Sequence, residues 1–164
     1  MKRREQMISG IFNRMLQLLA RVCPGATTLR VWLHRLRGVK IGKRVWIGYD
    51  AIIETSYPYL VEIQDDAAIG IRVTIIAHFK ESRGVVIEKG AFLGPGVIVM
   101  PNVSIGKGAV VTAGSVVTAS VGPMTLVQGN PARAVAEAGV MLDSGTSMKQ
   151  FLKHLRPGAH WQSR

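Results

Sequence analysis

Residues 85–117 read VVIEKG AFLGPG VIVMPN VSIGKG AVVTAG SVV, and this stretch decides the fold. The third position of each hexapeptide is aliphatic and the first is small or branched. The aliphatic positions are Ile87, Leu93, Val99, Ile105, Val111 and Val117. A period of six fits neither an α-helix nor an alternating strand, but it suits short strands joined by tight corners.

The same period extends toward the N-terminus, with two interruptions. It continues through Ile63, Ile69 and Ile75, and an earlier run holds Ile41, Ile47 and Ile53. Ten residues separate Ile53 from Ile63, so a loop around 55–60 bulges out. The second break is Glu81, where the polar segment 79–84 extends from a corner.

Three such strands make one triangular coil of eighteen residues, with aliphatic side chains inside and small residues at the corners. The sequence therefore predicts an all-β solenoid, a parallel β-helix whose coils stack at roughly 4.8 Å. The expected divisions are a basic helical cap at 1–38, the β-helix at 39–135, and a C-terminal tail at 136–164. A short helix over 147–155 should pack on the last coil.

The positive charge is concentrated at the N-terminus. The chain carries a net charge of +11, and residues 1–44 hold eleven of the 21 basic residues with Glu5 as their only acid. Ten basic and nine acidic residues remain for the other 120 positions, so a nucleic-acid-binding solenoid is not expected.

Two helices are predicted in this basic segment. Apolar residues spaced by three and four form one face of Met7–Val22, which Pro24 and Gly25 end, and a second helix covers 27–36. Two uses stay open. The helices cover the open end of the solenoid, or residues 1–37 form a basic amphipathic contact with an anionic membrane.

Cysteine and histidine are too sparse for a disulfide or a zinc site. Cys23 is the only cysteine, which fits a reducing compartment such as the cytoplasm. His78 is the only histidine within the repeat, because His34 falls in the cap and His154 and His160 fall in the tail. We therefore expect no metal.

His78 stands immediately before the segment that breaks the repeat. Counting eighteen residues per coil aligns it with Gly96, Gly114 and Ala132, and aligns Ala77 with Pro95, Ala113 and Pro131. These small residues predict a narrow groove that runs roughly 14 Å from the histidine to the last coil. A long thin ligand, such as the pantetheine arm of coenzyme A, fits such a groove.

Two motifs give the chain a resemblance to the hexapeptide-repeat acyltransferases, closest to the maltose, galactoside and polysaccharide O-acetyltransferase group. One is Ile75-Ile76-Ala77-His78 before a loop. The other is Ala113-Gly114-Ser115-Val116-Val117-Thr118 followed by Gly129-Asn130-Pro131-Ala132-Arg133. The resemblance covers about residues 38–135, and it implies a left-handed β-helix and a homotrimer.

The resemblance also implies the chemistry. His78 would be the general base that deprotonates an acceptor attacking the thioester of acetyl-CoA. The groove residues that would bind coenzyme A are Pro95, Gly96, Ala113, Gly114, Thr118 and Arg133, with Arg133 at a phosphate. A backbone N–H near Gly96 would stabilise the oxyanion. Many members have lysine after the threonine, and Ala119 in this chain puts that phosphate contact in doubt.

The loop at 54–57 is expected to form the acceptor side, with Glu54, Thr55 and Tyr57 as candidate substrate-binding residues. Glu54 is a candidate either to orient His78 or to hold an acceptor hydroxyl. We expect acetyl transfer to a sugar hydroxyl in surface polysaccharide or glycolipid synthesis, in the cytoplasm or at the inner face of the membrane. Two alternatives stay open: a non-catalytic hexapeptide scaffold and an N-acetyltransferase acting on an amino sugar.

Overall fold

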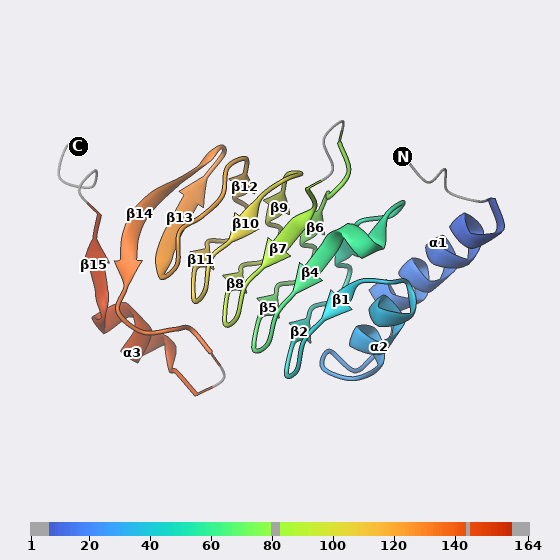
Figure 1. Cartoon of the computed structure of the whole chain (residues 1–164). Helices are drawn as coiled ribbons and strands as arrows, with labels where there is room; N and C mark the ends of the chain where they lie inside the picture. The colour runs from blue at the N-terminus through green and yellow to red at the C-terminus, as the bar shows by residue number, and fades with distance from the viewer. Residues whose placement is uncertain (1–6, 80–82, 144, 159–164) are drawn as a thin grey trace.

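Very short strands and tight corners wind into a triangular prism (Figure 1). Each of its three faces is a sheet in which strands of successive coils pair in parallel. The computed structural model describes residues 7–79, 83–143 and 145–158. The first sheet contains β1 (Lys40–Ile41), β4 (Val61–Ile63), β7 (Val85–Ile87) and β10 (Ser104–Ile105). The second begins with β2 (Trp46–Ile47), β5 (Ala68–Ile69), β8 (Phe92–Leu93) and β11 (Val110–Val111). The third contains β3 (Ile52–Ile53), β6 (Thr74–Ile75), β9 (Ile98–Val99) and β12 (Val116–Val117). The predicted left-handed parallel β-helix is confirmed.

The repeat places its aliphatic residues in the core. The third-position side chains from Ile47 to Val117 are at most 1 % exposed, and the small first-position residues are buried at the corners between strands. Glycine follows an aliphatic residue where the next coil passes too close for a side chain. A Cβ at Gly94, for example, would lie 2.6 Å from the Ala113 nitrogen.

Two insertions change the length of the coils. Ile63 pairs with Ile87 and Ile87 with Ile105, so the third coil begins 24 residues after the second, whereas the fourth follows after 18. The predicted bulge around 55–60 is confirmed, and it contains the 3₁₀ helix η1 (Pro58–Leu60). The second insertion lies between β6 and β7, and residues 80–82 of the predicted segment 79–84, Glu81 among them, lie outside the described residues.

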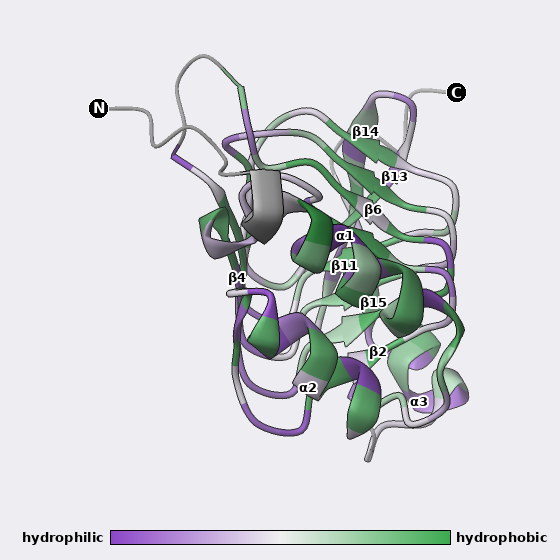
Figure 2. Ribbon diagram, turned by 90° about the vertical axis from the view of Figure 1, so that its right-hand side faces the viewer, coloured by the Kyte–Doolittle hydropathy of each residue, from purple (hydrophilic) through white to green (hydrophobic). Residues whose placement is uncertain are grey.

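Helices α1 (Met7–Val22) and α2 (Leu29–Leu36) cover the first coil (Figure 2). Their polar side chains donate hydrogen bonds to carbonyl groups that no preceding coil could satisfy. Gln17 Nε2 donates to the Ala51 carbonyl at 2.9 Å, and an Arg30 guanidinium N–H donates to the Ile47 carbonyl. These contacts satisfy exposed strand edges, so the helices occupy the position that the first of the two open interpretations expects.

The C-terminal end is closed by strands as well as by the predicted helix. The second sheet continues through β13 (Thr125–Gly129), β14 (Ala132–Ala138) and β15 (Leu155–Pro157), of which β14 is antiparallel to both neighbours. The helix expected over 147–155 is α3 (Met148–Lys153), and Ser147 caps it by accepting a hydrogen bond from the Gln150 N–H. The hairpin of β13 and β14 was not predicted.

Candidate active site

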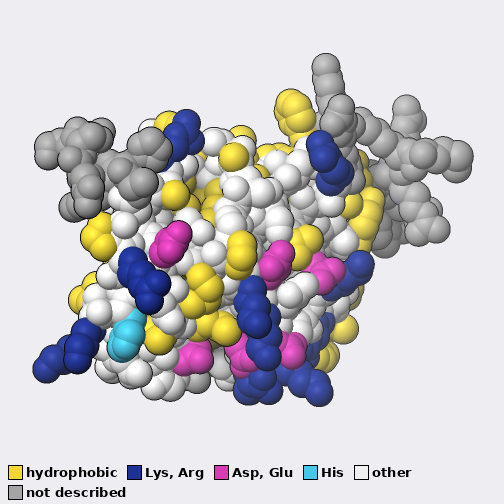
Figure 3. Space-filling model, turned by 60° about the vertical axis from the view of Figure 1, so that its left-hand side comes forward, with side chains coloured by type: hydrophobic (Ala, Val, Ile, Leu, Met, Phe, Trp, Pro, Cys, Tyr) yellow, Lys and Arg dark blue, Asp and Glu magenta, His cyan; other side chains and the backbone are white. Residues whose placement is uncertain are grey.

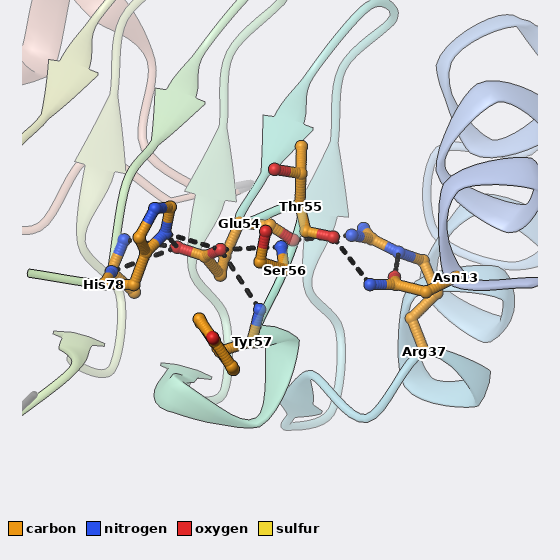
Figure 4. A network of polar contacts seen from close by, with 8 residues as sticks. Asn13, Arg37, Glu54, Thr55, Ser56, Tyr57 and His78 are labelled. Atoms are coloured by element: carbon orange, nitrogen blue, oxygen red, sulfur yellow. Dashed lines mark hydrogen bonds and ion pairs between the residues drawn. The ribbon is translucent and has the colours of Figure 1, made fainter. Parts of the chain in front are cut away.

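His78 and Glu54 form a close pair where the chain leaves the third sheet (Figure 4). Glu54 directly follows β3, and His78 lies three residues after β6, which pairs in register with β3. The Nδ1 atom of His78 lies 2.9 Å from Oε1 and 2.8 Å from Oε2 of Glu54. The carboxylate side chain is fully buried, whereas the imidazole is 46 % exposed.

The Glu54 carboxylate is saturated by donors. Its Oε1 accepts hydrogen bonds from the Ser56 and Tyr57 N–H groups at 2.8 and 3.1 Å. Its Oε2 accepts from the Ala77 and His78 N–H groups at 2.8 and 3.1 Å. The prediction that Glu54 binds the acceptor is therefore wrong, because both oxygens are occupied inside the protein. The alternative role, orienting the imidazole, agrees with the geometry.

The charge of Glu54 determines which nitrogen of His78 carries a proton. Burial by itself raises the pKa of the carboxyl, but hydrogen bonds from His78 and from backbone N–H groups outweigh it, and the pKa lies below its usual value. An ionised carboxylate only accepts hydrogen bonds, so Nδ1 of His78 is the protonated nitrogen. The lone pair of the neutral ring is then on Nε2, available to an external proton.

Side chains of the N-terminal segment donate hydrogen bonds to the backbone carbonyls of the Glu54–Thr55 turn. Arg37 donates to the Glu54 carbonyl at 2.5 Å, and Asn13 Nδ2 donates to the Thr55 carbonyl at 2.6 Å. Arg37 also donates to Asn13 Oδ1 at 2.7 Å and to the Gln17 side chain. The sequence analysis missed these residues. The available signal for two of them was the spacing of four between Asn13 and Gln17, which places both on one side of α1.

Burial shifts the titration of two groups in this support. It lowers the pKa of Arg37 to about 10, against an opposing effect of the Glu54 charge. Burial lowers the pKa of His34 to about 3, helped by the charges of Arg37 and Arg30. His34 is therefore neutral at pH 7, and its Nε2 has no hydrogen-bond partner among the described residues.

The other two predicted acceptor residues differ in their relation to His78. The Tyr57 ring packs edge-on against the imidazole, with 5.7 Å between ring centroids. Thr55 is half buried, and its carbonyl faces Asn13 rather than His78 (Figure 4). Tyr57 is therefore the predicted residue that borders the candidate base.

The predicted column of small residues beside His78 is wrong. The register aligns Ile75 with Val99 and Val117, so three residues later His78 shares its corner with Asn102 and Ser120. We call this corner the histidine edge. The error arose because segment 79–84 was counted as a strand of the coil, which moved Gly96 and Gly114 onto the wrong corner.

The predicted coenzyme-A residues Pro95, Gly96, Ala113 and Gly114 instead share the corner that follows the second sheet, which we call the glycine edge. The Gly114 N–H donates to the Pro95 carbonyl at 2.8 Å, and a Cβ at Gly114 would meet no atom within 4 Å. This edge is therefore open enough to receive a ligand. The Gly96 N–H donates to the Ile71 carbonyl, so the predicted use of this group for an oxyanion is wrong.

Arg133 and Thr118 lie on different sides of the prism. Arg133 is exposed on β14, and the hairpin is tied to the glycine edge by the Gly129 N–H, which donates to Ser115 Oγ at 3.1 Å. Thr118 directly follows β12 and so lies on the histidine edge. Ala119, which replaces the expected lysine, is exposed beside it.

A hollow of about 860 Å³ lies over the outer face of the second sheet, away from His78 and Glu54. Trp46, Phe92, Met141 and Met148 line it, and Pro95 connects it with the glycine edge. Figure 3 shows hydrophobic side chains on the C-terminal side of the molecule among basic and acidic ones. The lining of the hollow includes the carboxylates of Asp66 and Asp143 but no histidine, and we assign the candidate chemistry to the paired imidazole of His78. Within the described residues, no three His, Cys, Asp or Glu side chains form a metal-binding group.

Residues 84–119 match the family described as bacterial transferase hexapeptide (six repeats). A hexapeptide-repeat acetyltransferase from Vibrio cholerae O1 biovar eltor, solved with acetyl coenzyme A, is 22 % identical over 79 % of this chain and 87 % of its own, with a TM-score of 0.62. Galactoside acetyltransferase in complex with coenzyme A is 21 % identical over 79 % and 80 %, with a TM-score of 0.59. No curated protein sequence matches the chain.

A maltose O-acetyltransferase from Clostridium difficile 630 is 20 % identical over 79 % of this chain and 86 % of its own, with a TM-score of 0.55. Serine acetyltransferases share the fold as well. The predicted resemblance to hexapeptide-repeat acyltransferases is confirmed by the repeat match and by the shared fold.

Proposed function

We propose that this hexapeptide-repeat β-helix is an acyltransferase that moves an acetyl group from acetyl-CoA to a hydroxyl, with His78 as general base. The observation that carries the proposal is the pair of a buried carboxylate and a half-exposed imidazole with Nε2 open to a substrate. A structural histidine would not need a buried carboxylate saturated by four backbone donors to fix its tautomer.

The reaction follows from the position of the two nitrogens. Nε2 accepts the proton of the acceptor hydroxyl while the hydroxyl oxygen forms a bond to the carbonyl carbon of the thioester. The carbon–sulfur bond then breaks, and the proton on Nε2 passes to the departing thiolate, which regenerates the neutral base. Glu54 stabilises the imidazolium between these steps through Nδ1, as a positioning residue that touches neither substrate.

A homotrimer would bring the two edges together. His78 and Thr118 lie on the histidine edge, whereas Pro95, Gly96, Ala113 and Gly114 lie on the glycine edge, and the third sheet separates these edges within one chain. The outward side chains of the third sheet include Ile52, Ile98 and Val116, which are half buried and apolar. Packing this sheet around a threefold axis would cover them and place the histidine edge of one subunit beside the glycine edge of the next.

In this arrangement acetyl-CoA would lie between two subunits, with its pantetheine arm along the glycine edge and a phosphate near Arg133. The openness of Gly114 supports the fit. Two of the similar structures contain acetyl-CoA or coenzyme A, and the enzymes named for maltose and galactoside support a sugar hydroxyl as acceptor. We place the reaction in the cytoplasm, in the synthesis of surface polysaccharide or glycolipid.

The experiment measures thiol release from acetyl-CoA against a panel of sugars and sugar nucleotides. His78→Ala should lower the rate by roughly 10²-fold or more while the oligomer and coenzyme-A binding persist. His154→Ala is the matched control, because His154 is an exposed histidine beyond α3. Equal rates for the His78→Ala variant and the unmodified protein would leave the non-catalytic scaffold as the better description, and transfer only to amino groups would favour the N-acetyltransferase.

A further inference from the structure

Helix α1 turns a mixed side inward, on which Leu16 and Ala20 pack against Leu33 of α2, and turns most of its large apolar side chains outward. Asn13 and Gln17 are buried against the first coil, where they bind carbonyl groups. Phe12, Met15 and Leu18, by contrast, are each more than half exposed. A helix that only covered the solenoid would bury these side chains, because their exposure to water is unfavourable.

Helix α2 extends the same apolar surface. Figure 2 shows the two helices side by side at the N-terminal end of the prism. We call their exposed apolar side chains the outer helix face. It consists of Ile11, Phe12, Met15, Leu18, Leu19 and Val22 of α1 with Leu29, Trp32 and Leu36 of α2. Nine large apolar side chains on one end of a folded domain indicate a surface that binds something.

The charge around this face selects the partner. Residues 6–44 contain eight basic residues and no acid. Two of the eight are buried and two pair with Asp50 and Asp66, and the other four, Arg14, Arg35, Lys40 and Lys43, are exposed. A second copy of the chain on the outer helix face would bring these positive charges together. A surface of anionic lipid headgroups would instead neutralise them while its acyl chains cover the apolar residues.

We propose that the outer helix face binds the surface of an anionic lipid bilayer. Helices α1 and α2 would lie in the plane of the interface, with the basic side chains at headgroup level. No helix among the described residues has the length and hydropathy to cross a bilayer. The proposal concerns attachment and does not depend on the chemistry proposed for His78.

The experiment is cosedimentation of the full chain with phosphatidylglycerol-containing vesicles and with pure phosphatidylcholine vesicles. The unmodified protein should pellet with the anionic vesicles, and added salt should weaken this binding. The double variant Met15→Gln/Leu18→Gln should bind them roughly tenfold or more weakly. The matched control is Met148→Gln/Leu152→Gln on α3, because Met148 and Leu152 are 55 % and 57 % exposed, as against 57 % and 59 % for Met15 and Leu18.

Three outcomes would overturn the proposal. They are equal vesicle binding by the two double variants, equal binding of the unmodified protein to neutral and anionic vesicles, and a smaller oligomer for Met15→Gln/Leu18→Gln in analytical ultracentrifugation. The last would show that another copy covers the face. Thiol release with a soluble acceptor should be the same for Met15→Gln/Leu18→Gln and the unmodified protein, so a failure of the membrane proposal is distinguishable from a failure of the acyltransferase proposal.

Discussion

Replacing Glu54 with glutamine tests the buried carboxylate at the centre of the candidate site. The substitution keeps the shape of the side chain but turns one acceptor oxygen into an NH₂ donor. Each oxygen accepts two backbone N–H groups, so one pair of buried donors loses its partner whichever way the amide is oriented. At about 1–3 kcal/mol for each unsatisfied group, Glu54→Gln should lower the free energy of unfolding by roughly 2–6 kcal/mol.

The effect should depend on pH. The folded pKa of Glu54 lies below its usual value of 4.5, so its ionisation stabilises the fold fully above the unfolded pKa. This contribution disappears as the pH falls through the folded pKa. The difference in stability between the unmodified protein and Glu54→Gln should therefore be largest at neutral pH and shrink in acid.

Urea unfolding at a fixed protein concentration, between pH 7 and pH 3, measures this difference. Glu137→Gln is the control, because Glu137 is an exposed carboxylate on β14. In the thiol-release assay Glu54→Gln should lower kcat while leaving the KM for acetyl-CoA nearly unchanged. A loss of stability below about 0.5 kcal/mol, which is typical of surface substitutions, would refute the reasoning.

Two further predictions concern the fold. Gly94→Ala should destabilise the protein by about 1–3 kcal/mol in thermal or urea unfolding, because the added Cβ would lie 2.6 Å from the Ala113 nitrogen. Gly122→Ala, whose Cβ would meet only the Thr125 hydroxyl at 3.3 Å, should cost less, and equal losses would contradict the packing argument. His34 stays neutral in the folded protein down to about pH 3, whereas in the unfolded chain it takes up a proton below pH 6.5. The free energy of unfolding should therefore fall by about 1.4 kcal/mol for each unit by which the pH is lowered from 6.5 toward 3. His34→Gln should remove that slope from an unfolding series, and an unchanged slope would assign it to other groups.

The regular part of the fold was predictable because each hexapeptide repeats the same local requirement. An aliphatic residue such as Leu93 must enter the prism and a residue as small as Ala91 must fit at the corner, so position within the repeat predicts burial. The hairpin of β13 and β14 was not predictable from the same rule, because the period of six ends after Val117.

The candidate site was predicted only in part. His78 stood out because it precedes the break in the repeat. Which residues of the later coils share its corner, however, depends on how many residues each coil contains. Segment 79–84 contains six residues, as many as one repeat unit, so the aliphatic period stays in phase while every later residue moves to the next corner. Pairing between β6 and β9 resolves this ambiguity. The sequence carries one signal of it, the polar Glu81 at an aliphatic position, which the count of eighteen residues per coil did not take into account.

The partner of the imidazole was ambiguous for a different reason. A glutamate in a loop usually faces water, whereas the Glu54 carboxylate is enclosed by backbone N–H groups of its own turn and of the next coil, and Arg37 and Asn13 bind the carbonyls of this turn from the N-terminal segment. Such long-range contacts are invisible to periodicity. The apolar spacing predicted one face of α1, and the structure exposes most of that face but buries Leu16 against Leu33, while Asn13 and Gln17 bind the first coil.

Helix α1 therefore has two consequences for one enzyme. Asn13 fixes the turn that carries the carboxylate, and one residue earlier in the same helix Phe12 points outward. A truncation that removed α1 would loosen the orientation of the imidazole as well as any attachment of the protein. Under the two proposals, the attachment of the molecule and the alignment of its base would thus depend on opposite sides of the same sixteen-residue helix.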